Sequence, residues 1–184
     1  MKINLTRSFV DQEFSLHKKL ILENSSSHHL IKVLRKKEGD ELVLFDGKGN
    51  SCLGVISNIH RSEVQLDVID TFKKSLRSGI EINLGQSLIK NDAFNLTIQK
   101  ATELGVTSFH PLITDRSELK IKMTRNRSLR WNLIARGACE QCGENWLPII
   151  EDPIKLDIWA ANEESKIKIV LYPNADNKIS DFKY

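Results

Sequence analysis

Two neighbouring histidines introduce a cationic stretch near the N-terminus. His28 and His29 stand directly before "LIKVLRKKEGD", and histidine is a common metal ligand and proton carrier. Adjacent residues of a helix point about 100° apart, so one ion cannot easily bind both side chains. No Cys, Asp or Glu at a suitable spacing supports them. The pair therefore predicts polar residues at the start of a helix, and no metal site is expected.

A C-x-x-C motif occurs later, in "CEQC". Cys139 and Cys142 lie inside a helical pattern, and only Cys52 is left to join them, whereas a structural zinc site needs four ligands. A redox pair would normally lie at a turn from strand to helix. We therefore interpret these thiols as small, buried hydrophobic side chains. Three cysteines, an odd number, also argue against a secreted disulfide framework.

Glu140 and Gln141 are polar residues near the end of an otherwise apolar helical pattern. They are either simply exposed at the helix end, or they hydrogen-bond a base edge or position a catalytic loop.

Glycine-rich phosphate-binding loops are not found in the sequence, because the chain has neither G-x-G-x-x-G nor G-x-x-x-x-G-K-[ST]. A dinucleotide site or a P-loop is therefore not expected.

Positive charge is concentrated in two runs, although the formal net charge is only +3. Each run contains a single acid. The first run comprises Lys18, Lys19, Lys32, Arg35, Lys36 and Lys37, and the second comprises Arg116, Lys120, Lys122, Arg125, Arg127 and Arg130. Because each neutralised phosphate releases counterions, six cations on one face favour contact with nucleic acid. The alternative is a pair of solvated faces.

The elements that would position these residues begin with short strands. Strands rich in Val, Ile and Leu are expected at 18–22, 41–47, 52–59 and 63–70, with a glycine turn at 46–50. One helix is expected from Ser26, with a serine as its N-cap and with Leu30, Val33 and Leu34 on one face. Several short strands with one helix predict a small β-barrel.

The pattern changes after 72–79, a charged segment that is typical of a linker. Strands at 80–89, 106–113 and 166–173 alternate with helices at 92–105 and 124–143, which predicts a parallel α/β sheet. Asp92 and Thr124 are the expected N-caps, and Gly105 and Gly143 the expected stops. Three strands and two helices would leave apolar faces uncovered, so we expect a truncated chain or a partner that supplies the rest.

Membrane association is not expected. The N-terminus lacks the apolar core of a signal peptide, and the longest apolar runs, such as 169–172, are too short to span a bilayer. The sequence therefore predicts a soluble cytoplasmic protein.

Five segments together resemble the RsmE family, which are 16S ribosomal RNA uridine-N3 methyltransferases of the SPOUT (knotted α/β) class. They are collinear and cover most of the chain, and their combination is far more specific than any one of them. In order they are "RSFV" (7–10), "HHLIKVLRKKEGDELVLFDGKG" (28–49), "IQKATELGVTSFHPLITDRS" (98–117), "RWNLIARGACEQCGENWLPII" (130–150) and "LYPNA" (171–175).

The resemblance implies an α+β protein of two domains. Residues 1–74 would form a PUA-like β-barrel that binds RNA, and residues 75–184 would form part of an α/β SPOUT methyltransferase domain of the trefoil-knot type. The implied reaction transfers a methyl group from S-adenosylmethionine to N3 of a uridine in 16S rRNA of the small subunit. Family members act as homodimers.

Site residues follow from the resemblance together with the basic runs. The residues expected to contact RNA are Arg7, His28, Arg35, Lys36, Lys90, Arg116 and Arg125. Glu140 is the candidate catalytic residue, in a polar role near the base. Leu171, Tyr172 and Pro173 are expected beside the cofactor, because ligands of open α/β sheets bind where parallel strands end.

The chain departs from the family pattern in two places. The "GPEGG" and "LRxET" segments, which follow "LYP" and hold the cofactor in the family, are missing, and Glu144 stands where an arginine usually follows "EQCG". We therefore expect the knot region to be missing, cofactor binding to be weak or absent, and these 184 residues alone to show no turnover. The alternatives are a non-enzymatic RNA-binding module and a structural fragment without a function of its own.

Overall fold

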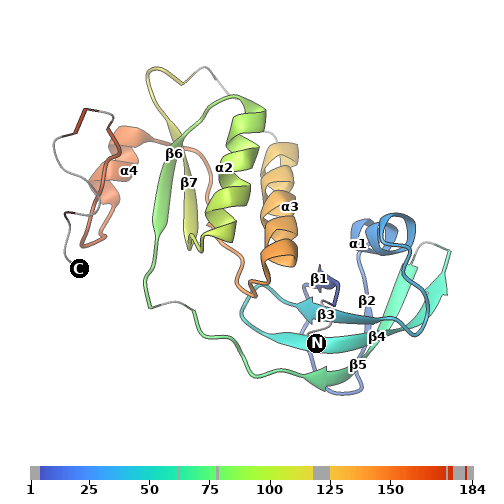
Figure 1. Ribbon diagram of the computed structural model, residues 1–184. Coiled ribbons are helices and arrows are strands. Elements are labelled where there is room, and N and C mark those ends of the chain that lie inside the picture. Colours follow the sequence, from blue (N-terminus) through green and yellow to red (C-terminus); the bar gives the residue numbers. More distant parts are fainter. Residues whose placement is uncertain are drawn as a thin grey trace.

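The computed structural model describes residues 5–61, 63–77, 79–117, 125–172, 174–175 and 181, and the architecture below refers to these. Two sheets form separate layers that meet near the C-terminal end of one long helix (Figure 1). The N-terminal sheet has five strands, and the second has four strands with helices on its faces.

The N-terminal sheet, called the barrel below, has the strand order β1-β3-β4-β5-β2. Its strands are β1 (Arg7–Phe9), β2 (Lys19–Ile21), β3 (Glu41–Phe45), β4 (Ser51–His60) and β5 (Glu63–Thr71). β1 runs parallel to β3, and the other neighbours are antiparallel. Among the described residues β1 and β2 do not pair with each other, so the expected barrel is open between them.

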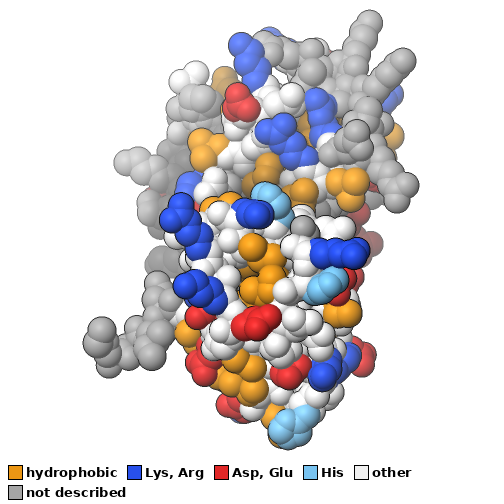
Figure 2. Space-filling model, turned by 90° about the vertical axis from the view of Figure 1, so that its right-hand side faces the viewer, with side chains coloured by type: hydrophobic (Ala, Val, Ile, Leu, Met, Phe, Trp, Pro, Cys, Tyr) orange, Lys and Arg blue, Asp and Glu red, His pale blue; other side chains and the backbone are white. Residues whose placement is uncertain are grey.

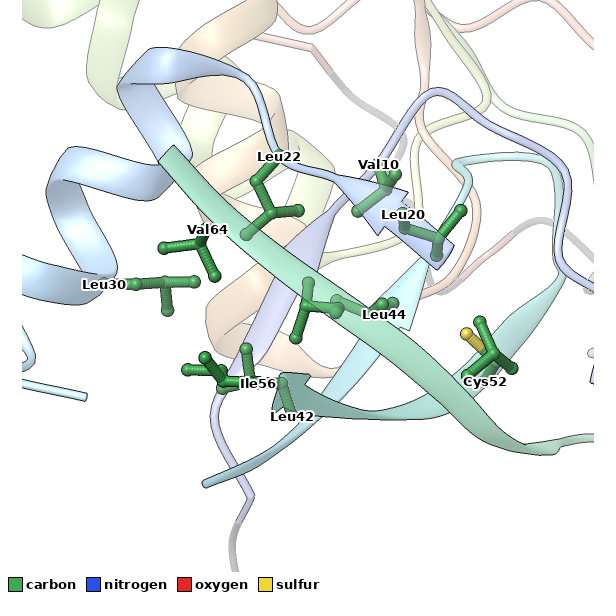
Figure 3. Packing of buried hydrophobic residues seen from close by; sticks show 11 residues of the cluster. Val10, Leu20, Leu22, Leu30, Leu42, Leu44, Cys52, Ile56 and Val64 are labelled. Atoms are coloured by element: carbon green, nitrogen blue, oxygen red, sulfur yellow. The ribbon is translucent and has the colours of Figure 1, made fainter. Parts of the chain in front are cut away.

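Alternation along these strands builds the barrel core (Figure 3). On β3, for example, Leu42 and Leu44 are fully buried while Glu41 is exposed. The core comprises Val10, Leu20, Leu22, Leu30, Leu42, Leu44, Cys52, Ile56, Val64, Leu66 and Val68. The four strands expected here are confirmed, whereas β1 is too short for its alternation to be seen in the sequence.

The helix expected from Ser26 starts earlier and changes type. α1 (Asn24–His28) continues directly into a π-helical turn, η1 (His29–Val33). The expected serine cap is wrong, since Glu23 is the N-cap residue and makes no side-chain capping bond. The hydroxyl of buried Ser27 instead bonds Leu22 O and Val64 N, each at 3.2 Å, which fixes α1 on the barrel. Leu30 is buried as expected, but Val33 and Leu34 are exposed.

The second sheet is parallel, as the alternation of strands and helices predicts. β6 (Asn83–Ser87), β7 (Ser108–Ile113) and β8 (Ile149–Ile150) lie in that order, and β9 (Ile154–Lys155) also pairs with β7. α2 (Asn91–Glu103) and α3 (Arg125–Cys142) cover one face of this sheet (Figure 1). Their core includes Leu88, Phe94, Ile98, Phe109, Trp131 and Ala135.

The opposite face of the second sheet carries an unexpected helix, α4 (Leu156–Asn162). Trp159 lies on the sheet here, with its ring centroid 5.5 Å from that of His110. A Cβ on Gly85 would stand 2.5 Å from the Trp159 ring, so only glycine allows this close approach. Part of the apolar face that was expected to be uncovered is therefore covered by α4.

The strand expected at 166–173 is wrong. Residues 166–172 are described and contain neither helix nor strand. β8 and β9 occupy one edge of β7 and β6 the other, so a further strand could join the sheet only at the outer edge of β6, and the described residues 166–172 form no ladder there. The isoleucines of this segment remain accessible, and Val170 is 88% exposed.

Helix ends follow the expectations in part. Gly105 and Gly143 end their helices with φ values of 84° and 89°, which glycine adopts without strain. The N-cap of α2 is Lys90, so Asp92 is not the cap; it lies in the first turn, where its charge still favours the helix dipole. Thr124 lies outside the described residues.

The segment after α3 connects the two sheets. Leu147 N donates to Gly47 O, and Gly49 N donates to Asn145 O, each at 3.0 Å. A small shared core of Phe9, Phe45, Cys139 and Leu147 lies beneath these bonds. The linker is also held here, because Trp146 Nε1 donates to Ser75 O at 3.2 Å.

Candidate functional site

The carboxyl ends of the parallel strands surround a cleft of about 670 Å³. β6, β7 and β9 run in the same direction, so the residues that end or follow them meet at one edge of the sheet. The cleft is lined by Ser87, Ile113, Thr114, Asp115, Arg116, Lys155, Leu156 and Asp157. We call it the carboxyl-edge cleft.

A tight turn presents the charged residues that follow β7. Ser117 Oγ donates to Thr114 O at 2.7 Å and accepts from Thr114 N at 3.2 Å. These bonds hold the backbone, so Asp115 and Arg116 remain exposed at the turn. Two carboxylates can accept hydrogen bonds from hydroxyl groups or face a cation, and Arg116 and Lys155 can pair with an anion.

Only Arg116 of this cleft was expected from the sequence. Lys155 and Asp157 were not predicted, because they lie in and just after β9, and a strand of two residues is too short to give a periodic signal. Asp115 directly follows a confirmed strand, and that position was the available signal. Lys90 is exposed just beyond the end of β6, on the same edge of the sheet.

The proposed cofactor neighbours are not brought to this cleft. Leu171 and Tyr172 are 77% and 63% exposed and are not among its lining residues. Pro173 lies outside the described residues. Since the strand that would have ended at these positions is not formed, the geometric reason for expecting them there no longer applies.

Basic side chains gather on the side of the molecule that carries α1 and one surface of α3. Figure 2 shows Lys and Arg side chains over both halves of this face, with hydrophobic side chains between them. His28 and Arg35 are exposed and Lys36 is partly exposed. The side chain of Arg125, at the start of α3, is outside the described part, as are Lys120 and Lys122. Each basic run has at least one exposed cation among the described residues, Arg35 in the first run and Arg130 in the second.

Arg7 is engaged inside the protein. Its Nη2 donates to Asn145 Oδ1 at 2.6 Å and to Glu144 O at 3.2 Å, and its guanidinium carbon lies 4.9 Å from the centroid of the Phe45 ring. Burial lowers the pKa of Arg7, partly opposed by the nearby Cys139, Cys142 and acidic side chains. The structure therefore places Arg7 between the barrel and the segment after α3.

The C-terminal end of α3 lies next to the barrel (Figure 1). Glu140 belongs to this end of α3 and lines none of the carboxyl-edge cleft. Its Oε1 accepts a hydrogen bond from Phe9 N at 3.0 Å. Burial raises the pKa of Glu140, while the bond from Phe9 and the charges of His29, Arg136 and Arg7 oppose the shift. Glu140 is thus not brought together with Lys90 or Arg116.

Glu144 has a local role that accounts for a carboxylate at this position. Its Oε1 accepts from Asn145 N at 2.7 Å and from Trp146 N at 3.1 Å. These two N–H groups follow the end of α3, and the carboxylate orders the segment that contacts the barrel. An arginine could not accept these bonds.

The thiols and histidines show no metal or redox arrangement. Among the described residues no group of three or more His, Cys, Asp or Glu is placed to hold a metal ion. Burial raises the pKa of Cys52 and of Cys139 to about 12, so neither is a thiolate near neutral pH. Cys139 is buried as expected, but Cys142 is exposed and free, so its interpretation as a buried hydrophobic side chain is wrong. In the part of the chain described, no helix has the length and apolarity needed to cross a membrane.

Two family models together match most of the chain. Residues 76–184 match the RNA methyltransferase domain, and residues 22–69 match the RNA methyltransferase PUA domain. Among curated relatives, the ribosomal RNA small subunit methyltransferase E of Buchnera aphidicola (subsp. Schizaphis graminum) is 29% identical over 98% of this chain and 75% of the relative. The protein of that name from Bacillus subtilis is 30% identical over 68% of this chain and 50% of the relative.

Two solved structures resemble the whole described fold. A methyltransferase of Legionella pneumophila in complex with bound S-adenosylmethionine matches with a TM-score of 0.93 and 28% identity, over 98% of this chain and 76% of that chain. The ribosomal RNA small subunit methyltransferase E of Neisseria gonorrhoeae, bound to S-adenosylmethionine, matches with a TM-score of 0.88 and 26% identity, over 98% and 75%.

Proposed function

The chain belongs to the RNA methyltransferase family, among the relatives of the ribosomal RNA small subunit methyltransferases E, and on that premise we propose that it methylates N3 of a uridine in 16S rRNA. The proposal includes S-adenosylmethionine as methyl donor and the SPOUT type for the α/β domain. The main support is the order of the two matched domains: an RNA methyltransferase PUA domain comes first in the chain, and a methyltransferase domain follows it. The same fold occurs in two solved relatives with bound S-adenosylmethionine.

The charged groups of the carboxyl-edge cleft suit this chemistry. S-adenosylmethionine, when bound, supplies the methyl group from its sulfonium. Asp115 and Asp157 can accept hydrogen bonds from hydroxyl groups and face a positive charge, and either carboxylate can take the proton that leaves N3. Arg116 and Lys155 can stabilise the negative charge that develops on O2 and O4 of the uracil ring.

The target uridine must be accessible on its Watson–Crick edge, so it is unpaired or turned out of its stack. The basic face beside α1, η1 and α3 would hold the surrounding RNA by its phosphates, through His28, Arg35 and Lys36. Arg125 is a further proposed contact, on the basis of the sequence alone. Leu171, Tyr172 and Pro173 remain proposed neighbours of the cofactor, on the condition that this segment rearranges. A ribosomal RNA substrate places the reaction in the cytoplasm.

A second copy of the chain is the proposed protein partner. Ile158, Val170 and Leu171 are exposed on α4 and on the segment that follows it, and exposed apolar side chains favour association. Light scattering during size exclusion tests this proposal, because a dimer would have about twice the 21.0 kDa of one chain.

The function is tested in the organism that encodes the chain. Deletion of the gene should remove one N3-methyluridine from 16S rRNA, measured by mass spectrometry of nuclease fragments, and a plasmid copy should restore it. Unchanged N3-methyluridine would overturn the proposal. If the purified chain nevertheless binds 16S rRNA with a strong salt dependence, the alternative of a non-enzymatic RNA-binding module is favoured.

A further inference from the structure

A second cleft, of about 270 Å³, lies between the barrel and α3. Its walls are β1, α1 and η1 on the barrel side and α3 on the other side, so residues from both domains form it. It is lined by Arg7, Ser8, Phe9, Ser25, Ser26, His29, Leu30, Leu133, Arg136, Gly137 and Glu140. We call it the interdomain cleft. Two of the elements that flank it also adjoin the basic face: η1, which Arg35 and Lys36 follow, and α3.

One carboxylate oxygen is available in this cleft. Oε1 of Glu140 accepts the bond from Phe9 N, and among the described residues no hydrogen bond to Oε2 is formed. The bond to a main-chain N–H fixes the carboxyl group, so Oε2 is a positioned acceptor. A positioned carboxylate in a partly buried cleft selects for a ligand that donates a hydrogen bond.

A planar cation stands beside this acceptor. The guanidinium carbon of Arg136 is 4.1 Å from the centroid of the Phe9 ring, and its Nη1 is 3.4 Å from Glu23 Oε2. Its side chain remains 28% exposed. Since the guanidinium is held between an aromatic ring and a carboxylate, it offers a fixed surface on which a flat ring can stack.

We propose that the interdomain cleft binds one nucleobase that carries an exocyclic amino group, stacked on Arg136 and donating a hydrogen bond to Glu140 Oε2. This inference rests on the proposed RNA substrate and adds a specificity-determining site outside the carboxyl-edge cleft. Acceptance of a cytosine amino group by Glu or Asp is an established form of base reading.

The chemistry of the cleft disfavours two other ligands. A phosphate would meet the carboxylate of Glu140, while Nη2 of Arg7 already donates to Asn145 and Glu144, and Nη1 of Arg136 is paired with Glu23. Uracil has an N3–H donor, but a carbonyl oxygen flanks it on each side and would face the carboxylate. The amino groups of cytosine, adenine and guanine lie at the edge of their rings, where one carboxylate oxygen can reach them.

The test selects bound RNA from a pool of random single strands. With the full chain, we expect one position of the bound sequences to favour an amino-bearing base over uracil, and about tenfold tighter binding of an oligonucleotide with that base. In Glu140→Gln, Oε1 can still accept from Phe9 N while the amide places a donor toward the cleft. In this variant the preference for an amino-bearing base should disappear or turn toward uracil. The affinity for the unselected pool of random RNA should change by less than about threefold.

Two further variants complete the test. Arg136→Lys keeps the charge but removes the planar group, and it should weaken binding of every oligonucleotide that fills the cleft. Glu164→Gln changes an exposed carboxylate that follows α4, on the other face of the second sheet, and should keep the wild-type preference. Circular dichroism confirms that each variant is folded.

The outcomes separate the two proposals. If the folded wild-type chain binds no RNA, the proposed RNA substrate fails, and this inference fails with it. If it binds RNA without a base preference, or if Glu140→Gln keeps the wild-type preference, only the interdomain cleft proposal is overturned.

Discussion

The indole ring of Trp146 lies directly against Gly49, so that a Cβ on this glycine would stand 2.5 Å from Cζ2 of the ring. Gly49 belongs to the turn between β3 and β4, and Trp146 belongs to the segment after α3. The guanidinium of Arg77 and the ammonium of Lys74 lie over the same indole, 4.7 and 5.1 Å from its centroid. One aromatic ring thus connects the barrel, the linker and the α/β domain.

Gly49→Ala should lower the free energy of unfolding by about 2–4 kcal/mol, because it adds a steric clash to a strained backbone conformation. Gly39→Ala is the matched control: its φ of 88° equals the 90° of Gly49 within two degrees, but nothing lies within 4 Å of the added Cβ. It should cost only about 1 kcal/mol. Urea denaturation measures both, and equal losses would show that the contact with Trp146 is unimportant.

Arg7→Lys should lower stability by about 1–2 kcal/mol, since a lysine cannot make both bonds to Asn145 Oδ1 and Glu144 O and lie over the Phe45 ring. The loss is measured by urea denaturation, and RNA affinity at constant salt should change little. If affinity falls while stability is unchanged, Arg7 contacts RNA, as the family resemblance implies.

Arg35→Gln and Lys36→Gln should each weaken RNA binding and reduce the slope of log affinity against log salt by about 0.7, the value for one phosphate contact on a single strand. Fluorescence anisotropy between 50 and 300 mM salt measures this slope. Lys166→Gln, an exposed cation after α4, is the control and should leave the slope unchanged. If all three variants show the same slope as the wild-type chain, Arg35 and Lys36 of the barrel do not contact RNA.

Periodic patterns predicted the buried strands and both long helices well, because burial on one face leaves a repeat in the sequence. The same reasoning failed at 166–173, where alternating Lys166, Ile167 and Lys168 resemble a strand, but the described residues pair with neither β6 nor β7. Pairing partners are a tertiary property that local alternation does not contain.

The candidate sites divide in a similar way. Arg116 was found because basic runs are visible in sequence, whereas Lys155 and Asp157 become neighbours of Arg116 only when β9 pairs with β7. Arg7 was expected to contact RNA and Glu140 to act near the base, but the sequence could not show that each of them makes a hydrogen bond to the other domain. Contacts between residues more than 130 positions apart depend on the fold.

The raised pKa of Glu140 gives stability a particular pH dependence. Between the ordinary value near 4.5 and the higher folded value, the folded protein holds a proton that the unfolded chain has lost. The free energy of unfolding of the wild-type chain, relative to Glu140→Gln, should therefore fall as pH rises through this range and then become constant. Urea denaturation at a series of pH values from 4 to 8 measures it, and a difference that rises with pH contradicts the burial of this group.

Glu103 is a control of opposite sign. The hydrogen bond from Lys100, the main cause, together with that from Gln99, lowers the pKa of Glu103 below 4.5. Its contribution is present above this value and is lost as pH falls through the folded pKa. The wild-type chain, relative to Glu103→Gln, should therefore become less stable as pH falls below 4.5, whereas relative to Glu140→Gln it should not.

The carboxyl-edge cleft can be located by titrating S-adenosylmethionine into the isotope-labelled chain and following amide resonances. Because this method detects even millimolar binding, the largest shifts should occur at Thr114–Ser117 and at Leu156 and Asp157, which line or adjoin the cleft. Asp157→Asn should weaken the affinity about tenfold or more, since it removes a charged acceptor, while Glu164→Gln should have no effect. Shifts concentrated at Phe9, His29 and Glu140 instead would move the cofactor to the interdomain cleft, and would leave the carboxyl edge of the sheet without its proposed role.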